Sequence, residues 1–421
     1  MALALSGGGD SMALLRIASD WARLRGRRLV AITVDHGLNP DSPAWSRLCQ
    51  DAAREAGADW IERRWEETKP ATGLTAAARA ARHGLIAEAA REVGARVVLF
   101  AHTADDIAES DWMRGQPMGE GGSTLGRLRE WSPSPAWPEG RGLMLLRPML
   151  DARRDDLRAW LRENGQVWIE DPANADERFG RSRARARLAD GPRSEDGERP
   201  DPSSVSGRCS FAGAEPLSLG EGFAVARSVR ATELAAVLLC ASGRSEPVRR
   251  DRLERLAQRL SSGEVFTAAL SGARIEAGRD RIIIGREAGE FRRRPVAEVA
   301  LEPGVAAVWD NRFEIMTAEP GWTVGAAAGR LNRLSPADRA ILKPVPEAMR
   351  AALPVLIRDG GGDPLLAGRP VLAWRKAEVR ALAPRRLALF LDASTGETTQ
   401  EADLERTIHG EMPPPDLFSH D

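Results

Sequence analysis

The feature that most constrains the fold is a glycine-rich turn near the start of the chain, Ser6–Ser11, with the sequence Ser-Gly-Gly-Gly-Asp-Ser. It lies between a short apolar run, Met1–Leu5, and a segment, Ser11–Leu24, whose apolar residues recur at helical spacing. Glycines let the backbone adopt positive φ and approach a ligand closely. The helix that follows points free N–H groups and its positive dipole end at the turn. The turn therefore predicts a strand–loop–helix unit that binds an anion.

The same alternation continues along the first part of the chain. Strands are expected at Leu29–Val34, Trp60–Trp65, Arg96–Ala101 and Leu143–Leu146, and helices at Pro43–Ala56, at Leu74–Val93, from an N-cap at Thr103, and at Arg153–Glu163. Strands that alternate with helices form a parallel sheet with helices on both faces. We therefore expect an α/β fold with an open parallel sheet, followed by a small helical domain and an α+β C-terminal domain.

A chain of 421 residues is too long for one ordinary core, so several domains are expected. Residues 1–188 would form the catalytic domain, and residues 189–222, rich in Gly, Pro, Ser and acidic residues, a mobile linker. Residues 223–290 would form a mainly helical substrate domain, and residues 291–421 the C-terminal domain.

Three local patterns refine this division. Val225–Leu260 has helical periodicity, and Val265–Leu270 and Arg281–Gly285 are expected to be strands around a Ser271-Gly272 turn. Pro117–Gly142 is rich in Gly and Pro and is expected to be a mobile lid or a substrate loop.

Polar residues follow two further strands of the expected sheet. Asp35 and His36 come directly after one, and His102, Asp106 and Glu109 follow another at spacings that place them on one helix face. Ligands bind at the carboxyl ends of parallel strands, so these groups would face the glycine-rich turn. The carboxylates could bind Mg²⁺ or an ammonium group. Alternatively, His36 is a polar turn residue, and the acidic pair only caps its helix.

These segments resemble a known family. The turn is similar to the loop of the PP-loop ATP pyrophosphatases, which cleave ATP between the α and β phosphates. A P-loop would have a lysine after the glycines, and this turn has none. Three stretches, Val34–Ser42, Ala101–Ser110 and Arg147–Leu150, together with Trp168–Asn174 and the arginine-rich stretch after it, resemble tRNA(Ile)-lysidine synthetase over residues 1–190.

The resemblance implies an activity and a set of roles. ATP would adenylate the C2 oxygen of the wobble cytidine in an isoleucine tRNA with a CAU anticodon, and the ε-amine of free L-lysine would then displace AMP. The ATP phosphates would be held by Ser6, Gly7, Gly8, Gly9, Asp10 and Ser11, with Asp35 and His36 beside the nucleotide. Asp10 would also bind Mg²⁺. His102, Asp106 and Glu109 would form the catalytic and lysine-binding cluster. The chain departs from the family pattern at Ile107, Ser110 and Gln116–Gly119.

An arginine-rich stretch, 178–187, suggests how tRNA is held. Arg181 and Arg185 align on one helix face and would contact tRNA phosphates, as would Arg147 by the resemblance. The alternative is a solvated helix end. The near-zero net charge, −1, argues against a uniformly basic nucleic-acid binder.

Two other functions stay open. Thiolation enzymes with the same loop generally use paired cysteines, whereas Cys49, Cys209 and Cys240 are far apart in sequence. A non-catalytic RNA- or nucleotide-binding relative would accommodate the departures from the family pattern. No apolar run is long enough to span a membrane, no signal peptide is evident, and the cysteine pattern fits a reducing cytoplasm. The sequence implies no oligomeric state.

Overall fold

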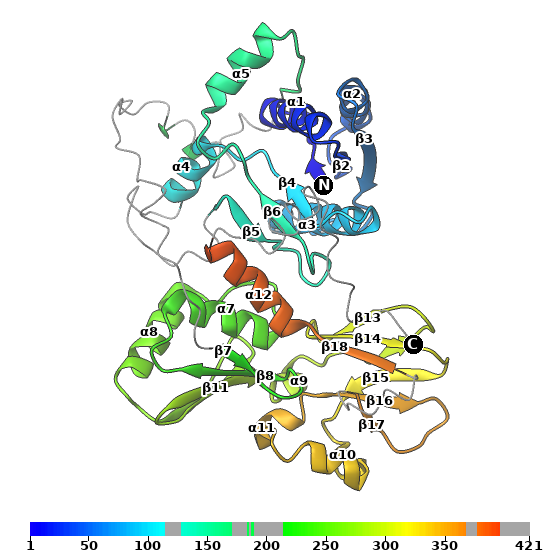
Figure 1. The fold of residues 1–421 in the computed structure, drawn as a ribbon, viewed down its shortest axis with the longest axis vertical. Coiled ribbons are helices and arrows are strands. Elements are labelled where there is room, and N and C mark those ends of the chain that lie inside the picture. Colours follow the sequence, from blue (N-terminus) through cyan, green and yellow to red (C-terminus); the bar gives the residue numbers. More distant parts are fainter. Residues whose placement is uncertain (114–127, 171–182, 185–186, 189–213, 368–376, 396–421) are drawn as a thin grey trace. The chain divides into compact units, whose positions relative to one another are not determined.

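A computed structural model describes the chain except for residues 114–127, 171–182, 185–186, 189–213, 368–376 and 396–421 (Figure 1). Contacts divide the chain into two compact units, and each is described by itself. The first comprises residues 1–122, 127–209 and 392–421, and the second residues 123–126 and 210–391. None of the helices in the described ranges is long and apolar enough to cross a membrane.

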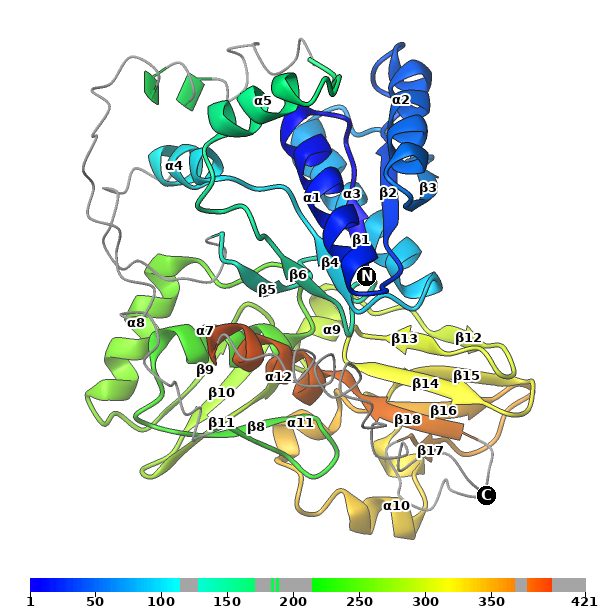
Figure 2. The same ribbon diagram turned by 45° about the horizontal axis from the view of Figure 1, so that its top comes forward.

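The first unit is built on a six-stranded sheet with the order β3-β2-β1-β4-β6-β5 (Figures 1 and 2). Its strands are β1 (Ala2–Ala4), β2 (Val30–Asp35), β3 (Asp59–Arg64), β4 (Val97–Leu99), β5 (Trp131–Pro133) and β6 (Met144–Leu146). Every neighbouring pair from β3 to β6 is parallel, which confirms the expected parallel sheet. At one edge, β5 pairs antiparallel with β6. This strand lies inside the segment for which we expected a lid or substrate loop.

Helices cover both faces of this sheet (Figure 1). They are α1 (Gly9–Leu24), α2 (Ser42–Glu55), α3 (Leu74–Glu92), α4 (Ala104–Met113) and α5 (Arg154–Glu163). Successive strand residues point to opposite faces. Leu3 of β1 accordingly packs in one core with Met12 of α1 and Leu157 of α5, whereas Ala2 packs in another core with Ile86 of α3. Two apolar layers therefore hold the strand ends in place.

Helix α4 begins where Thr103 was expected to cap it, but the capping bond runs the other way. The Thr103 backbone N–H and hydroxyl both donate to Oδ2 of Asp106, at 2.9 and 3.1 Å. A carboxylate three residues into a helix commonly satisfies the N–H at its start in this manner. The start of α4 is thus fixed by the side chain of Asp106.

The second unit contains two groups of elements, and the first is a five-stranded antiparallel sheet with the order β7-β8-β11-β10-β9. It comprises β7 (Ala214–Pro216), β8 (Gly222–Ala226), β9 (Phe266–Leu270), β10 (Ala273–Ala277) and β11 (Arg281–Arg286), which pack with α7 (Ala231–Ser242) and α8 (Arg250–Ser261). This region therefore contains more strand than the small helical domain we expected. Strand β7 lies within the stretch expected to be a linker.

Two corrections concern this sheet. The helical interpretation of Val225–Leu260 is wrong at its start, which is the end of β8, and the helix is broken where Gly243 adopts φ 68° and ends α7. The expected turn has Ser271 at φ 49° and Gly272 at φ 81°, as a tight hairpin requires. It joins β9 to β10, a strand that we did not predict.

The second group has a four-stranded sheet, β12-β15-β16-β17, and a three-stranded sheet, β13-β14-β18. The strands are β12 (Val299–Leu301), β13 (Ala307–Trp309), β14 (Phe313–Thr317), β15 (Trp322–Ala326), β16 (Pro354–Arg358), β17 (Leu365–Leu366) and β18 (Ala377–Ala381). The helices are α9 (Glu290–Arg293), η3 (Leu331–Arg333), α10 (Pro336–Ile341), α11 (Glu347–Arg350) and α12 (Leu382–Thr395). An apolar core around Trp309 and Phe313 holds these elements together, except for α12, whose Ala383 and Leu387 pack in the core of the first group; the α+β character matches what we expected here.

A buried ion cluster links the two groups within the second unit. Asp310, in the turn between β13 and β14, accepts bonds from Arg286 of β11 at 3.1 and 3.2 Å and from Nε of Arg312 at 2.7 Å. Burial lowers the pKa of the Arg312 guanidinium, and Asp310 partly offsets that shift. One carboxylate therefore balances two buried cations, so its removal should be costly.

Candidate active site

The glycine-rich turn after β1 has a conformation that only glycine adopts easily. Gly7 has φ 81°, and its carbonyl accepts a hydrogen bond from the backbone N–H of Ile169 at 2.9 Å. A Cβ on Gly7 would overlap Cδ1 of Ile169 and lie 3.1 Å from Sγ of Cys49. Gly8 also forms an isolated parallel bridge with Ile169. The segment after α5 thus passes directly against the turn and fixes its shape.

The start of α1 is open to an anion. Gly8 is the N-cap residue, and no side chain among the described residues caps the helix. The Ser11 hydroxyl donates to the Gly8 carbonyl at 2.9 Å and lies 3.1 Å from the Ser6 hydroxyl. Because the Ser6 side chain is exposed, its hydroxyl is accessible to a ligand. Free N–H groups, two hydroxyls and the helix dipole together suit phosphate.

Asp10, in the first turn of α1, has one carboxylate oxygen in use and one unpartnered. Its Oδ2 accepts a hydrogen bond from Nε of Arg154 at 3.1 Å, whereas its buried Oδ1 has no hydrogen-bond partner in the described part of the chain. Burial raises the pKa of the Asp10 carboxyl, and the positive charge of Arg154 opposes that shift. A buried oxygen without a donor, beside a phosphate site, suits a cation.

Arg154 brings Asp10 together with the two predicted carboxylates of α4. Its Nη1 donates to Oε1 of Glu109 at 2.9 Å, and its Nη2 lies 3.6 Å from Oδ2 of Asp106. Both α4 carboxylates are buried. Burial alone lowers the pKa of the Arg154 guanidinium, but the Glu109 hydrogen bond and the charges of Asp10 and Asp106 outweigh it and raise the pKa. The guanidinium is therefore a permanent cation at the centre of this cluster.

The structure pairs His102, the third predicted residue of the cluster, with Arg147. Nε of Arg147 donates to Nδ1 of His102 at 3.2 Å, and the imidazole stacks on Phe100 with the ring centroids 5.9 Å apart. Arg147 also donates from Nη1 to the Arg129 carbonyl and to the Ser132 hydroxyl, both at 2.8 Å. Because Nδ1 accepts a hydrogen bond, the bond favours the neutral tautomer that carries its proton on Nε2. The guanidinium of Arg147 is buried, so in this structure it orients His102.

Asp35 and His36 lie at the carboxyl end of β2, as expected. Asp35 accepts the Gly37 backbone N–H at 2.7 Å, and His36 packs edge-on against Trp65, with the ring centroids 6.0 Å apart. Burial lowers the pKa of His36, and the nearby Arg82 lowers it further. Since β1 and β2 are parallel neighbours, this end of β2 lies at the same sheet edge as the turn.

The predicted tRNA contacts Arg181 and Arg185 lie outside the described residues. Arg183 and Arg187, their described neighbours, are exposed. Contact between this stretch and tRNA phosphates stays a prediction. The functional roles assigned to the other site residues also stay predictions. Sequence reasoning missed Arg154. The signal available was its place in the first turn of α5, after a strand that ends at the same sheet edge.

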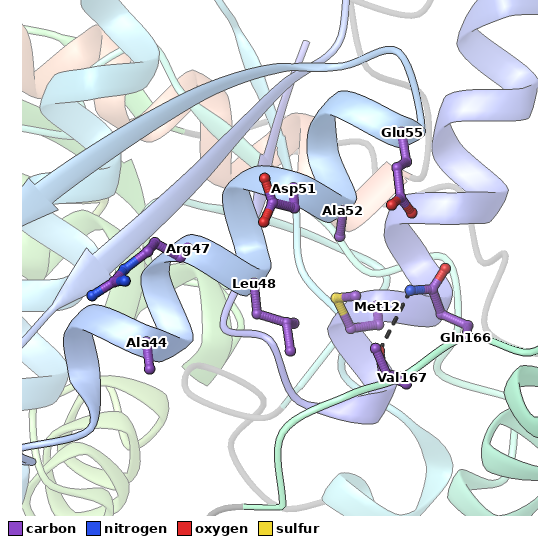
Figure 3. A pocket seen from close by; sticks show the side chains of 9 residues that line it. All are labelled: Met12, Ala44, Arg47, Leu48, Asp51, Ala52, Glu55, Gln166 and Val167. Carbon is purple, nitrogen blue, oxygen red and sulfur yellow. Dashed lines mark hydrogen bonds between the residues drawn. The ribbon is translucent and has the colours of Figure 1, made fainter.

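A hollow of about 390 Å³ lies between α1, α2 and the segment after α5 (Figure 3). Met12, Leu48 and Val167 supply apolar surface, and Asp51 and Glu55 are among its charged lining residues. A second hollow, of about 320 Å³, is lined in part by residues of α2 and β3. Neither is lined by the glycine-rich turn or the α4 carboxylates, so the turn and its charge cluster, not these hollows, mark the candidate site.

Comparisons with known proteins identify the family of the chain. Residues 1–191 match a family described as a PP-loop domain. A tRNA(Ile)-lysidine synthase of Caulobacter vibrioides is 43% identical over 405 residues, which are 96% of this chain and 94% of that protein. One from Hyphomonas neptunium is 36% identical over 78% of this chain and 89% of its own length. One from Ralstonia nicotianae is 32% identical over 93% and 86%.

Among solved structures, the U34-tRNA thiolase NcsA from Methanococcus maripaludis, with its [4Fe-4S] cluster, matches 45% of this chain and 64% of its own. The identity is 15% and the TM-score 0.36, too low to support an inference.

Proposed function

The chain belongs to the tRNA(Ile)-lysidine synthase family, and from that membership we propose that it joins lysine to the wobble cytidine of an isoleucine tRNA with a CAU anticodon. The family identifies the protein as an ATP-using, tRNA-modifying ligase with a PP-loop domain. In the proposed reaction the cytidine C2 oxygen attacks the α-phosphorus of ATP and pyrophosphate leaves. The lysine ε-amine then attacks C2, the bond to AMP breaks, and the amine loses its protons.

One observation carries the proposal from the structure: two buried carboxylates of α4 lie within reach of the same guanidinium as the phosphate-turn carboxylate Asp10. Adenylation makes the C2 oxygen a leaving group, so the amine must attack beside the place where the phosphate is held. Asp106 and Glu109 would bind the lysine ammonium and orient its nitrogen. Placing both tasks in one cluster is what a two-step transfer on one base requires.

The remaining residues of the turn are assigned to the nucleotide. The backbone N–H groups of Gly7–Gly9 and the hydroxyls of Ser6 and Ser11 would hold the phosphates, with Asp35 and His36 at the neighbouring strand end. The unpartnered Oδ1 of Asp10 fits a magnesium ligand, and Mg²⁺ bound there would neutralise phosphate charge. No group of three or more acidic, His or Cys side chains in the described ranges forms a metal site. The phosphates would therefore supply other ligands.

We place the reaction in the cytoplasm, where tRNA is processed. Both cysteines that the structure describes, Cys49 and Cys240, are buried free thiols, and burial raises the pKa of each, to about 11 and about 12. They are therefore inert thiols that fit a reducing compartment.

The test is incorporation of radiolabelled L-lysine into tRNA with Mg²⁺ and ATP. We expect label in an isoleucine tRNA transcript with a CAU anticodon, with one AMP formed for each lysine incorporated. The same transcript with a GAU anticodon should contain no label. Asp10→Asn should lose at least about a hundredfold in rate, because the carboxylate beside the phosphates is gone. Asp20→Asn is the matched control, since Asp20 lies on the same helix and pairs with Arg23 on the surface. AMP release without labelled tRNA would reject the lysine assignment, and full activity of Asp10→Asn would reject the site.

A further inference from the structure

We infer that Arg154 is the internal cation of the lysine site, and that its exchange from the α4 carboxylates onto the phosphates of ATP makes lysine binding depend on nucleotide. The inference rests on the proposed function and adds to it an order of binding: nucleotide first, amine second. Arg154 would be a positioning residue that couples two substrates, and its side chain would be the moving part.

The geometry places one guanidinium on three carboxylates. Nε contacts Asp10 at 3.1 Å, Nη1 contacts Glu109 at 2.9 Å, and Nη2 lies 3.6 Å from Asp106. The side chains of Arg154 and Glu109 are 13% and 2% exposed, so water screens these pairs little. The guanidinium of Arg154 is thus a charge partner that the phosphate-turn carboxylate and the two α4 carboxylates share in a partly dry site.

While Arg154 occupies this place, lysine gains little. A buried carboxylate must have a partner, and Glu109 and Asp106 already share one. An incoming ammonium would have to give up its hydration in return for carboxylates that are already paired with a guanidinium. We therefore expect weak lysine binding in the absence of nucleotide.

A triphosphate at the start of α1 changes the competition for Arg154. Nε of Arg154 already contacts Asp10 in the phosphate turn. A guanidinium also binds phosphate through two parallel N–H···O bonds, so the ATP phosphates would compete with the carboxylates for Arg154. Arg158 lies one helical turn further along α5, and its Cγ would be 3.5 Å from a Cβ on Gly9. The Nε of Arg158 is buried without a hydrogen-bond partner in the described part of the chain. Helix α5 therefore presents two arginines to the phosphate turn.

The backbone of α5 stays anchored during such an exchange. The Arg154 backbone N–H donates to Oδ2 of Asp105 at 2.8 Å, and the Ala104 N–H donates to the Ala152 carbonyl at 3.0 Å. The start of α5 is thus pinned to the start of α4. When the Arg154 side chain turns to phosphate, the α4 carboxylates lose this guanidinium, and the lysine ammonium takes its place.

Thermodynamic linkage makes the effect measurable. If nucleotide raises the affinity for lysine by some factor, lysine raises the affinity for nucleotide by the same factor, and such couplings commonly lie between about 5-fold and 150-fold. The experiment is calorimetric titration of L-lysine into the full-length protein at pH 8, with and without Mg²⁺ and α,β-methylene-ATP, which cannot be cleaved between the α and β phosphates. Binding is read directly, without catalysis.

We expect the lysine Kd of the parent to fall at least about tenfold when the analogue is present. In Arg154→Gln the Kd should change less than about twofold, and lysine should already bind about as tightly without the analogue as it binds to the parent with it. Arg153→Gln is the matched control. Arg153 precedes Arg154, is largely exposed and pairs with Asp105, so its removal should leave the parent ratio intact.

An unchanged ratio in Arg154→Gln would overturn the inference, including the case in which lysine binds more weakly in both states, as a static role would give. If Arg154→Gln does not fold, Arg154→Lys keeps a cation that cannot span three carboxylates, and its ratio should fall at least about threefold. Lysine transfer to tRNA without any nucleotide effect on lysine binding rejects the coupling alone. Absence of both lysine binding and lysine transfer rejects the proposed function.

Discussion

The most direct perturbation of the phosphate turn is a single methyl group at Gly7. This residue has φ 81°, where an L side chain costs about 1–2 kcal/mol. The new Cβ would also overlap Cδ1 of Ile169, and overpacking of this kind costs about 1–3 kcal/mol. Gly7→Ala should therefore destabilise the domain by about 2–5 kcal/mol, a large part of a typical domain's stability.

The assay is native-state hydrogen exchange of peptides that cover β1 and α1, which reports the opening free energy of this unit in the full chain. Gly8→Ala is the matched control: Gly8 has φ −71°, and a Cβ there would have its nearest heavy atom at 3.7 Å. We expect it to cost less than about 1 kcal/mol, since only the N-cap preference changes.

Ile169→Val removes the atom that the new methyl group would meet, and so separates the two contributions to the cost of Gly7→Ala. In a double-mutant cycle it should recover the steric part, about 1–3 kcal/mol, and leave the backbone part. If Gly7→Ala costs no more than Gly8→Ala, the argument from conformation and close approach is wrong. If Ile169→Val restores full stability, the left-handed backbone carries no cost.

Three other predictions follow from the structure and the sequence. Asp310→Asn leaves two buried arginines without their carboxylate and should lower the free energy of unfolding of the second unit by about 3–5 kcal/mol, measured by hydrogen exchange; a change below about 1 kcal/mol would contradict the cluster's importance. Burial and nearby arginines lower the pKa of His83 to about 2, so the fold holds it neutral while the unfolded chain binds a proton below about pH 6.5. The stabilisation from neutral His83 is fully present above about pH 6.5, and below it the free energy of unfolding falls by up to about 1.4 kcal/mol for each pH unit. His83→Phe should remove this pH dependence from the unfolding free energies measured by urea titration between pH 6 and 4. Arg181→Ala and Arg185→Ala should weaken tRNA binding and make its salt dependence shallower in filter-binding titrations; unchanged binding at every salt concentration would remove these contacts.

The first unit could be predicted well because its signals are local. Apolar spacing placed α1, α2, α3 and α5 within one or two residues of their observed bounds, and the glycine-rich turn set the position of β1. The two α4 carboxylates were placed on one face from a spacing of three, and the structure has both of them facing Arg154.

What could not be predicted depends on contacts between distant parts of the chain. Arg154 and Asp10 are separated by 144 positions, and arginine is so common in this chain that one more attracts no notice. Strand β10 was missed because its alternation, Ala273 to Ala277, is short and includes charged residues on its half-buried side. Its stability comes from pairing with strands on both sides, which periodicity does not reveal.

The bridge between Gly8 and Ile169 bears on how the protein is made. The turn precedes Ile169 in the chain, so the backbone that holds it emerges from the ribosome only after the strands and helices that position the site have been synthesised. A nascent chain that ends before Ile169 lacks the backbone contact that restrains the glycines of the turn. The glycine-rich turn therefore gains this backbone restraint only after translation has passed Ile169.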